Sequence, residues 1–194
     1  MKNESNVMRV INNIINVIIK FTEIVYWCAA VACVVFFFLA LSGNHSIFHF
    51  LTYQPDSLSG NGLSIIFTNK ITEADYNIVY PLFFFTNIIV CILFAKVFRY
   101  INLTFKTAQG KTKYSEGETF FQKKNVEFIQ KIGFLSIGMI AVEIIMQVII
   151  KVALGDAVTV FVNYTPIHMG IVILCLSQFF AQAISLQKDV DGLL

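Results

Sequence analysis

The chain has 194 residues, of which 57% are hydrophobic and 13% charged, and its formal net charge is +2. A soluble domain carries about 25% charged residues, so this composition excludes an ordinary soluble globular domain and indicates a membrane protein. The small net charge gives no support for direct binding to nucleic acid.

Four long apolar runs predict transmembrane helices at about residues 24–42, 79–98, 132–151 and 167–187. A helix needs roughly 20 residues to cross the hydrocarbon of a bilayer. The runs are continuous and lack the alternation of a transmembrane barrel. We therefore predict an all-α polytopic membrane protein, a four-transmembrane-helix bundle that forms a single membrane domain over residues 1–194, with the lipid bilayer as its surroundings.

The basic residues give these helices an orientation. Of the Lys and Arg residues, only Lys70 and Lys151 lie on the side opposite the termini; the other twelve lie before the first run, between the second and third, or after the fourth. Cytoplasmic loops carry the excess of Lys and Arg. Both termini and the middle loop are therefore predicted to be cytoplasmic.

Residues 7–23 have an amphipathic pattern. Ile11, Ile14 and Ile18 follow helical spacing, and polar residues such as Asn16 and Glu23 occupy the opposite face. We expect a helix that lies at the cytoplasmic membrane surface and then turns into the first span. It serves either as an anchor beside the bundle or as a docking helix for a partner.

The first outer loop, residues 43–75, contains turn-forming residues at 54–56 and 59–62. Residues 48–53 and 63–68 have the composition of short strands, which predicts a small extracellular β-hairpin. Pro81 is expected in the first turn of the second helix, where its missing N–H costs little. The last outer loop, residues 155–166, is expected to be a brief connection.

The middle loop is predicted to run from Arg99 to about Glu118. From Thr119 the apolar residues return to helical spacing, with Phe121, Asn125 and Phe128 on one face. We expect the third transmembrane helix to extend into the cytoplasm as a helical stalk.

Glu143 is the most unusual residue, because it falls near the middle of the third span. A charge at that depth costs about 3 kcal/mol, so the side chain should face protein. Gln147 shares its helix face, and Asn87 and Gln178 lie at matching depths on the second and fourth spans. These four residues form a candidate intramembrane polar cluster. It acts either as a proton or cation relay or as hydrogen-bonding glue between helices.

The sequence shows no arrangement of residues with catalytic spacing and no metal-binding cysteine pattern. His45 and His49 are four residues apart near the outer end of the first span, and His168 begins the fourth. A shared metal or pH-sensing site at these histidines is the alternative to plain loop histidines. We predict a protein that is not an enzyme and has no cofactor or metal.

Two stretches resemble a known family. Residues 117–135 and 186–194 are similar to the bacterial membrane family called domain of unknown function 2975. The matching positions are Phe121, Asn125, Val126, Ile129, Ile132, Gly133, Asp189, Asp191 and Leu193. Members often have Ser, Thr or Pro where this chain has Gln122, and Arg where it has Lys. The resemblance implies a bacterial cytoplasmic membrane location. Because members are often thought to be encoded beside small DNA-binding regulators, it also suggests a regulatory or immunity role.

The leading hypothesis is a non-enzymatic membrane regulator or immunity-type protein that acts through a protein partner on the cytoplasmic face. The basic stalk and tail on that side favour it. The alternative is a small ion-coupled transporter that uses Glu143. The sequence does not identify the ligand, the partner or the oligomeric state.

Overall fold

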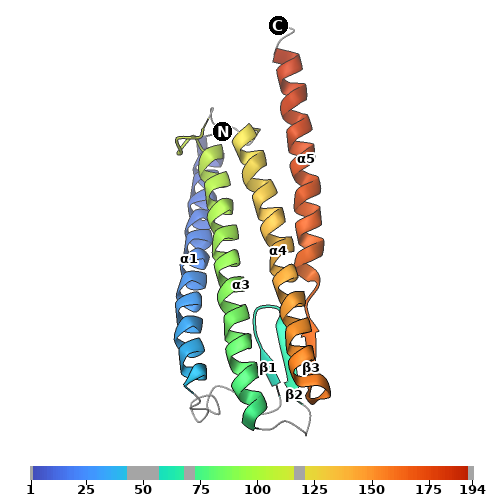
Figure 1. Cartoon of the computed structure of the whole chain (residues 1–194). Helices are drawn as coiled ribbons and strands as arrows, with labels where there is room; N and C mark the ends of the chain where they lie inside the picture. The colour runs from blue at the N-terminus through green and yellow to red at the C-terminus, as the bar shows by residue number, and fades with distance from the viewer. Residues whose placement is uncertain (1, 43–56, 68–72, 116–120, 192–194) are drawn as a thin grey trace. The chain divides into compact units, whose positions relative to one another are not determined.

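The computed structural model describes residues 2–42, 57–67, 73–115 and 121–191. Its long helices are α1 (Lys2–Leu41), α3 (Glu73–Ala108), α4 (Lys123–Leu154) and α5 (Thr165–Asp191) (Figure 1). Within the described residues, each of these four helices is long and apolar enough to cross a membrane. The prediction of four helices of spanning length is therefore confirmed.

Helix α3 is longer than the sequence predicted at both ends. It continues to Ala108, so the expected loop from Arg99 is wrong over its first ten residues. Pro81 lies inside this helix and not in its first turn, and there its ring removes one intrahelical hydrogen bond. The helix ends at Ala108, and Gly110 two residues later has a φ of 71°, a left-handed conformation that suits glycine. The N–H of Lys111 then donates to the carbonyl of Lys106 at 2.9 Å.

Helix α4 carries the predicted stalk and the third span as one uninterrupted helix. Residues 116–120, where the stalk was predicted to begin, lie outside the described residues. After α4 comes a 3-10 turn, η1 (Gly155–Ala157). Helix α5 begins where the side-chain oxygen of Asn163 accepts a hydrogen bond from the N–H of Thr165 at 3.0 Å.

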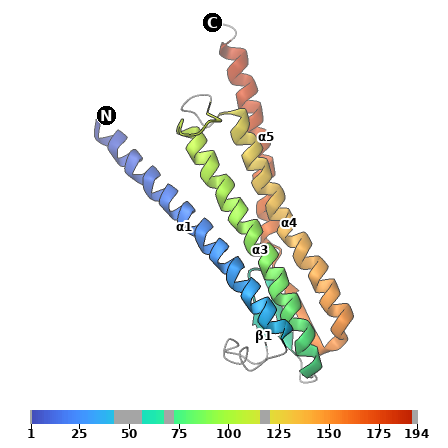
Figure 2. The same ribbon diagram turned by 60° about the vertical axis from the view of Figure 1, so that its left-hand side comes forward.

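The prediction of a separate surface helix at the N-terminus is wrong, as helix α1 shows. It is a single helix without the predicted turn between residues 7–23 and the first span (Figure 2). Ile14 and Ile18 are exposed, whereas Glu23 is buried and ion-paired with Lys20 at 2.9 Å. Asn16 also bonds inward, to the side chain of Gln109. Asn16 and Glu23 of the predicted polar face thus contact protein, whereas Ile14 and Ile18 of the predicted apolar face are exposed.

The chain divides into two compact units. The first, which we call the basic unit, contains residues 1–25, 94–136 and 168–194. The second, the sheet unit, contains residues 26–93 and 137–167. All four long helices contribute residues to both units.

A three-stranded antiparallel sheet gives the sheet unit its name. Its order is β1 (Ser57–Ser59), β2 (Leu63–Phe67) and β3 (Val158–Val162). The second predicted strand is confirmed, and it pairs with residues 57–59; residues 48–53 lie outside the described residues. The connection at 155–166 was expected only to be brief, and the strand β3 within it was not predicted. In β3, Val158 and Val160 alternate with exposed residues, the burial pattern of a strand with one covered face.

The core of the sheet unit lies between the sheet and the helices. Leu63 and Ile65 of β2 are at most 1% exposed, and they pack with Val79 of α3 and Ile150 of α4. In Figure 1 the strands run beside α3 and α4. This packing sets the hairpin between β1 and β2 against the two helices that carry Asn87 and Glu143.

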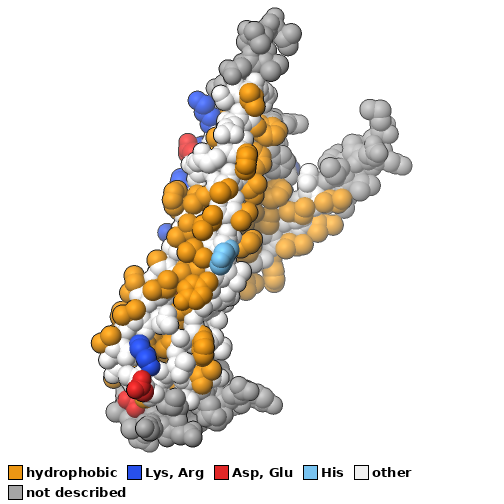
Figure 3. Space-filling view, turned by 90° about the vertical axis from the view of Figure 1, so that its right-hand side faces the viewer, with side chains coloured by type: hydrophobic (Ala, Val, Ile, Leu, Met, Phe, Trp, Pro, Cys, Tyr) orange, Lys and Arg blue, Asp and Glu red, His pale blue; other side chains and the backbone are white. Residues whose placement is uncertain are grey.

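The outer faces of the helices are apolar as well. Orange hydrophobic side chains cover much of the surface seen in Figure 3. On α5 the exposed large hydrophobic residues are Met169, Ile171, Val172, Leu176, Phe179 and Leu186. A helix apolar on both its packed and its free sides is typical of a chain surrounded by lipid.

Candidate functional site

Glu143 is enclosed by protein in the sheet unit. It is only 1% exposed, although Ile144 and Ile145 beside it on α4 are exposed. Its Oε2 atom has no hydrogen-bond partner among the described residues. A buried carboxylate oxygen without a partner is rare, and it calls for a bound proton, a cation or a water molecule.

The tip of the β1–β2 hairpin closes over Glu143. A Cβ atom built on Gly62 would overlap the carboxylate, with Cδ at 2.7 Å. The φ of Gly62 is 138°, a conformation that other residues rarely adopt. Its carbonyl accepts a hydrogen bond from the N–H of Asn163 at 2.9 Å. Both the space and the backbone conformation therefore require glycine beside Glu143.

The same tip is bonded to α3 through Asn87. The side-chain oxygen of Asn87 accepts from the N–H of Asn61 at 3.2 Å, and its amide nitrogen donates to the carbonyl of Phe83 at 3.0 Å. The Asn61 side chain donates to the sulfur of Cys91 at 3.2 Å. A Cβ atom on Gly60 would overlap the Asn87 amide. Asn87 therefore both hydrogen-bonds to the hairpin tip and packs closely against it.

Gln147 joins α4 to the sheet one helical turn from Glu143. Its side-chain nitrogen donates to the carbonyl of Val160 in β3 at 3.2 Å. Lys151, one turn further along, donates to the carbonyl of Val158 and forms an ion pair with Asp156, each at 3.3 Å. One face of α4 thus supplies a row of polar contacts that ends at Glu143.

Glu143, Asn87 and Gln147 all belong to the sheet unit. Gln178 is an exposed residue of α5 in the basic unit, and its predicted place beside Glu143 stays a prediction. The sequence analysis missed the contribution of the hairpin tip. Its signal was present, since Gly60, Asn61 and Gly62 combine two glycines with a hydrogen-bonding side chain. The turn was recognised but was not connected with the polar residues of the helices.

The family-motif residues lie in the basic unit. Asn125 is 1% exposed, and the ring of Phe121 lies 5.7 Å from that of Phe180. At Gly133, an added Cβ would meet Cγ of Leu174 at 2.6 Å and the carbonyl of Gly170 at 3.1 Å, so this glycine allows α4 and α5 to approach closely. Asp189 and Asp191 are within α5, but their side chains lie outside the described residues.

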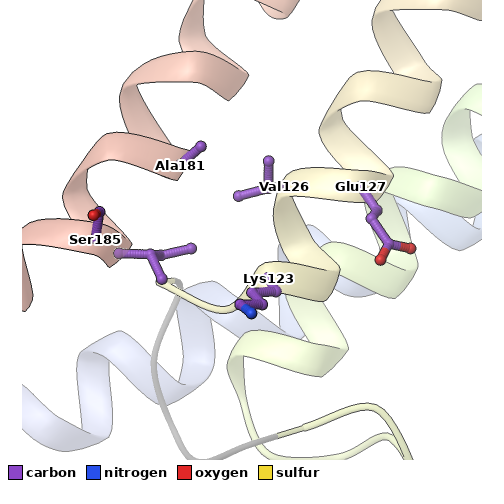
Figure 4. A pocket seen from close by; sticks show the side chains of 6 residues that line it. Lys123, Val126, Glu127, Ala181 and Ser185 are labelled. Atoms are coloured by element: carbon purple, nitrogen blue, oxygen red, sulfur yellow. The ribbon is translucent and has the colours of Figure 1, made fainter. Parts of the chain in front are cut away.

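A groove between α4 and α5 is the other candidate site, also in the basic unit. It has a volume of about 440 Å³ and is lined by Lys123, Val126, Glu127, Ala181, Ile184 and Ser185. Figure 4 shows Val126 and Ala181 pointing toward each other across it. Its apolar lining residues are Val126, Ala181 and Ile184, and Lys123 and Ser185 add polar groups, while the side chain of Glu127 lies on the side of α4 turned away from α5 in Figure 4.

Metal binding has no support within the described part of the chain, where no group of three His, Cys, Asp or Glu residues gathers. His45 and His49 lie outside that part, and the free cysteines include buried Cys91 and exposed Cys28. Comparison with protein-family models, with curated proteins and with solved structures gave no match. The resemblance to domain of unknown function 2975 therefore stays a prediction.

Proposed function

We propose that the chain is a four-span integral membrane protein of the bacterial cytoplasmic membrane, with both termini in the cytoplasm. The charge difference between the two units supports this topology. The basic unit has twelve Lys and Arg against seven Asp and Glu, a net charge of +5. The sheet unit has two Lys and Arg against five Asp and Glu, a net charge of −3. An excess of Lys and Arg marks the cytoplasmic end of a bundle.

Thiol labelling in intact cells tests the topology. In a background without the native cysteines, Asp156→Cys is expected to react with a membrane-impermeant maleimide added outside. Lys111→Cys is the matched position, because both residues are exposed in turns. It is expected to react only after the membrane is permeabilised. Labelling of both positions from the same side would contradict the four-span topology.

Within this topology, the protein acts as a non-enzymatic regulator that binds a segment of a cytoplasmic protein. The groove between α4 and α5 carries this proposal. Its apolar walls at Val126, Ala181 and Ile184 match the apolar side chains of a peptide segment. Lys123 and Ser185 add polar groups that can fix the direction of such a segment. A groove of about 440 Å³ has room for only a few side chains, which suits a regulatory, reversible contact.

Site-specific photocrosslinking in cells tests the groove. A benzophenone amino acid at Ser185 is expected to capture one protein of defined mass, whereas the same group at exposed Gln178 is not. Ala181→Trp fills the groove and should abolish the crosslink. Ala141→Trp, the same change at an exposed position of α4, should leave it intact. Adducts to lipid alone, or the same protein adduct from Gln178, would refute the proposal.

A second candidate function is proton or cation transport through Glu143. The observation that favours it is the buried Oε2 atom, which has no hydrogen-bond partner among the described residues. Intramembrane carboxylates that face the protein interior are typical of proton and ion pathways. The irregular backbone of the hairpin tip beside it is typical of ion sites in transporters.

Proteoliposomes that contain a pH-sensitive dye distinguish the two functions. If Glu143 carries protons, the unchanged protein should support a proton flux without added uncoupler. Glu143→Gln should abolish this flux and leave the yield of folded protein unchanged. Glu127→Gln removes a carboxylate from an exposed ion pair and is the matched control. No difference between the variants and the original protein would exclude proton transport through Glu143, and the same comparison with a sodium- or potassium-sensitive dye tests cation transport.

A further inference from the structure

A second cavity in the basic unit gathers four cations around aromatic rings. Its volume is about 430 Å³, and it is separate from the groove between α4 and α5. Its lining residues come from α3, α4 and the turn between them: Lys96, Arg99, Tyr100, Leu103, Tyr114, Lys124, Phe128 and Lys131. The cavity is therefore positively charged and has an aromatic and aliphatic floor.

The aromatic rings hold the cations in place. The rings of Tyr100 and Phe128 lie 5.9 Å apart, and those of Tyr114 and Phe128 lie 6.0 Å apart. The ammonium group of Lys131 lies 5.5 Å from the centroid of Tyr100, and that of Lys124 lies 5.7 Å from the centroid of Tyr114. Contacts of a cation with a ring face stabilise its position by about 0.5–1 kcal/mol at exposed sites. The long side chains thus lose part of their freedom before any ligand binds.

The positive charge of this cavity is only partly balanced. Glu127 forms an ion pair with Lys124 at 2.5 Å. Among the described residues, no ion pair involves Lys96, Arg99 or Lys131. Glu127 also acts electrostatically on Lys131 without forming a bond to it. Three cations without an ion pair therefore converge on one cavity, and none of its described lining residues is Asp or Glu.

We propose that this cavity binds a phosphate group. A phosphate ester presents several acceptor oxygens, and Arg99 can pair with two of them while lysines pair with the others as point charges. Lys96 and Lys131 lie at the predicted ends of the second and third spans, the depth of a lipid headgroup. The apolar floor suits the glycerol and upper chain of a phospholipid. The choice of a lipid over free phosphate as the ligand rests on the proposed membrane topology. The proposal of a phosphate site does not depend on that topology.

Native mass spectrometry of the full chain released from detergent tests the site. Dioleoyl phosphatidylglycerol is the probe, and dioleoyl phosphatidylcholine, whose charge is balanced, is the reference lipid. Arg99→Gln with Lys131→Gln should weaken retention of phosphatidylglycerol about tenfold or more, because charge-assisted hydrogen bonds are lost. Both residues are exposed, so folding should persist, and a monodisperse elution profile verifies this.

The control is Lys106→Gln with Lys111→Gln, which removes the same charge from exposed residues that do not line the cavity. It should retain the lipid as the unchanged protein does. Equal losses in the two double variants would overturn the proposal, because general surface charge would then explain the binding. A titration of the lipid-bound protein with inorganic phosphate distinguishes a phospholipid headgroup from free phosphate as the ligand. Displacement of the lipid at millimolar phosphate would support the site with free phosphate as its ligand, and no displacement would support the lipid.

Discussion

The two units bury different kinds of side chain. Among the described residues, the sheet unit buries eighteen hydrophobic residues and three polar or charged ones, Thr86, Asn87 and Glu143. The basic unit buries eight hydrophobic residues and seven polar or charged ones. The core of the sheet unit is thus mainly apolar with one carboxylate, whereas in the core of the basic unit polar groups are nearly as common as apolar ones.

This difference decides what holds each unit together. In the sheet unit, β2 and β3 fill the space between helices with side chains such as Ile65 and Val158, both fully buried. In the basic unit, hydrogen bonds connect the end of α3 with the start of α4. Thr107 is at their centre, since its carbonyl accepts from the side chains of Ser115 and Gln122 at 2.5 and 3.4 Å. We expect steric changes to harm the first unit most and the loss of single hydrogen bonds to have moderate effects in the second.

The largest effect is expected for Gly62→Ala. The new methyl group would overlap the Glu143 carboxylate, and the φ of 138° would be strained for alanine. Overlap and strain each cost about 1–3 kcal/mol, so a loss of about 3 kcal/mol or more is expected. The measurement is the midpoint of thermal unfolding in detergent. Gly138→Ala is the control, because no atom lies within 4 Å of its added Cβ, and this change within a helix should raise stability slightly.

A double variant sharpens this test. Glu143→Ala removes the atoms that the new methyl group would meet, so Gly62→Ala should cost less in that background. The strain at Gly62 would remain in both. Equal costs in the two backgrounds would show that the hairpin tip does not press against Glu143.

The helical part of this fold could be predicted from sequence because long apolar runs leave few alternatives. Strand β2 was also predicted, but β3 could not be, for two physical reasons. Residues 158–162 are a short apolar run after a glycine, and such runs do not distinguish a strand from a connection without the partner strand. Their partner, β2, is about one hundred residues away in the sequence. Helix α1 was misread for another reason: the amphipathic pattern of residues 7–23 was interpreted as a separate helix at the membrane surface, whereas these residues continue without a turn into the first span.

The candidate site was predicted in the same uneven way. Glu143, Asn87 and Gln147 could be selected because polar residues are conspicuous in apolar runs. Depth along a helix does not specify the direction of a side chain around it, so the assignment of Gln178 had no comparable basis. The contact of the hairpin tip with Asn87 and Glu143 could not be predicted, because it depends on β2 lying against α3 and α4.

A smaller effect is expected for Gly133→Ala in the basic unit. The added Cβ would approach Leu174 at 2.6 Å and the backbone carbonyl of Gly170 at 3.1 Å. A side chain can move more readily than backbone, so a loss of about 1–3 kcal/mol is expected. Leu174→Ala in the same chain should recover part of it. An unchanged unfolding midpoint for Gly133→Ala alone would mean that α4 and α5 do not pack closely here.

The smallest effect is expected for Thr107→Val, which tests whether hydrogen bonds stabilise the basic unit. Thr107 is fully buried, and its hydroxyl is bonded to that of Thr112 at 2.8 Å. Valine keeps the shape and removes this bond, so a loss of about 1 kcal/mol is expected. Thr104→Val is the control, since among the described residues the Thr104 hydroxyl bonds to the carbonyl of Tyr100 on its own helix and to no other element. Hydrogen exchange at the N–H groups of Lys111 and Ser115 should accelerate in the first variant and not in the second. If both variants behave alike, the turn between α3 and α4 is stabilised by its apolar contacts. The two units would then differ in the composition of their cores but not in the kind of contact that stabilises them.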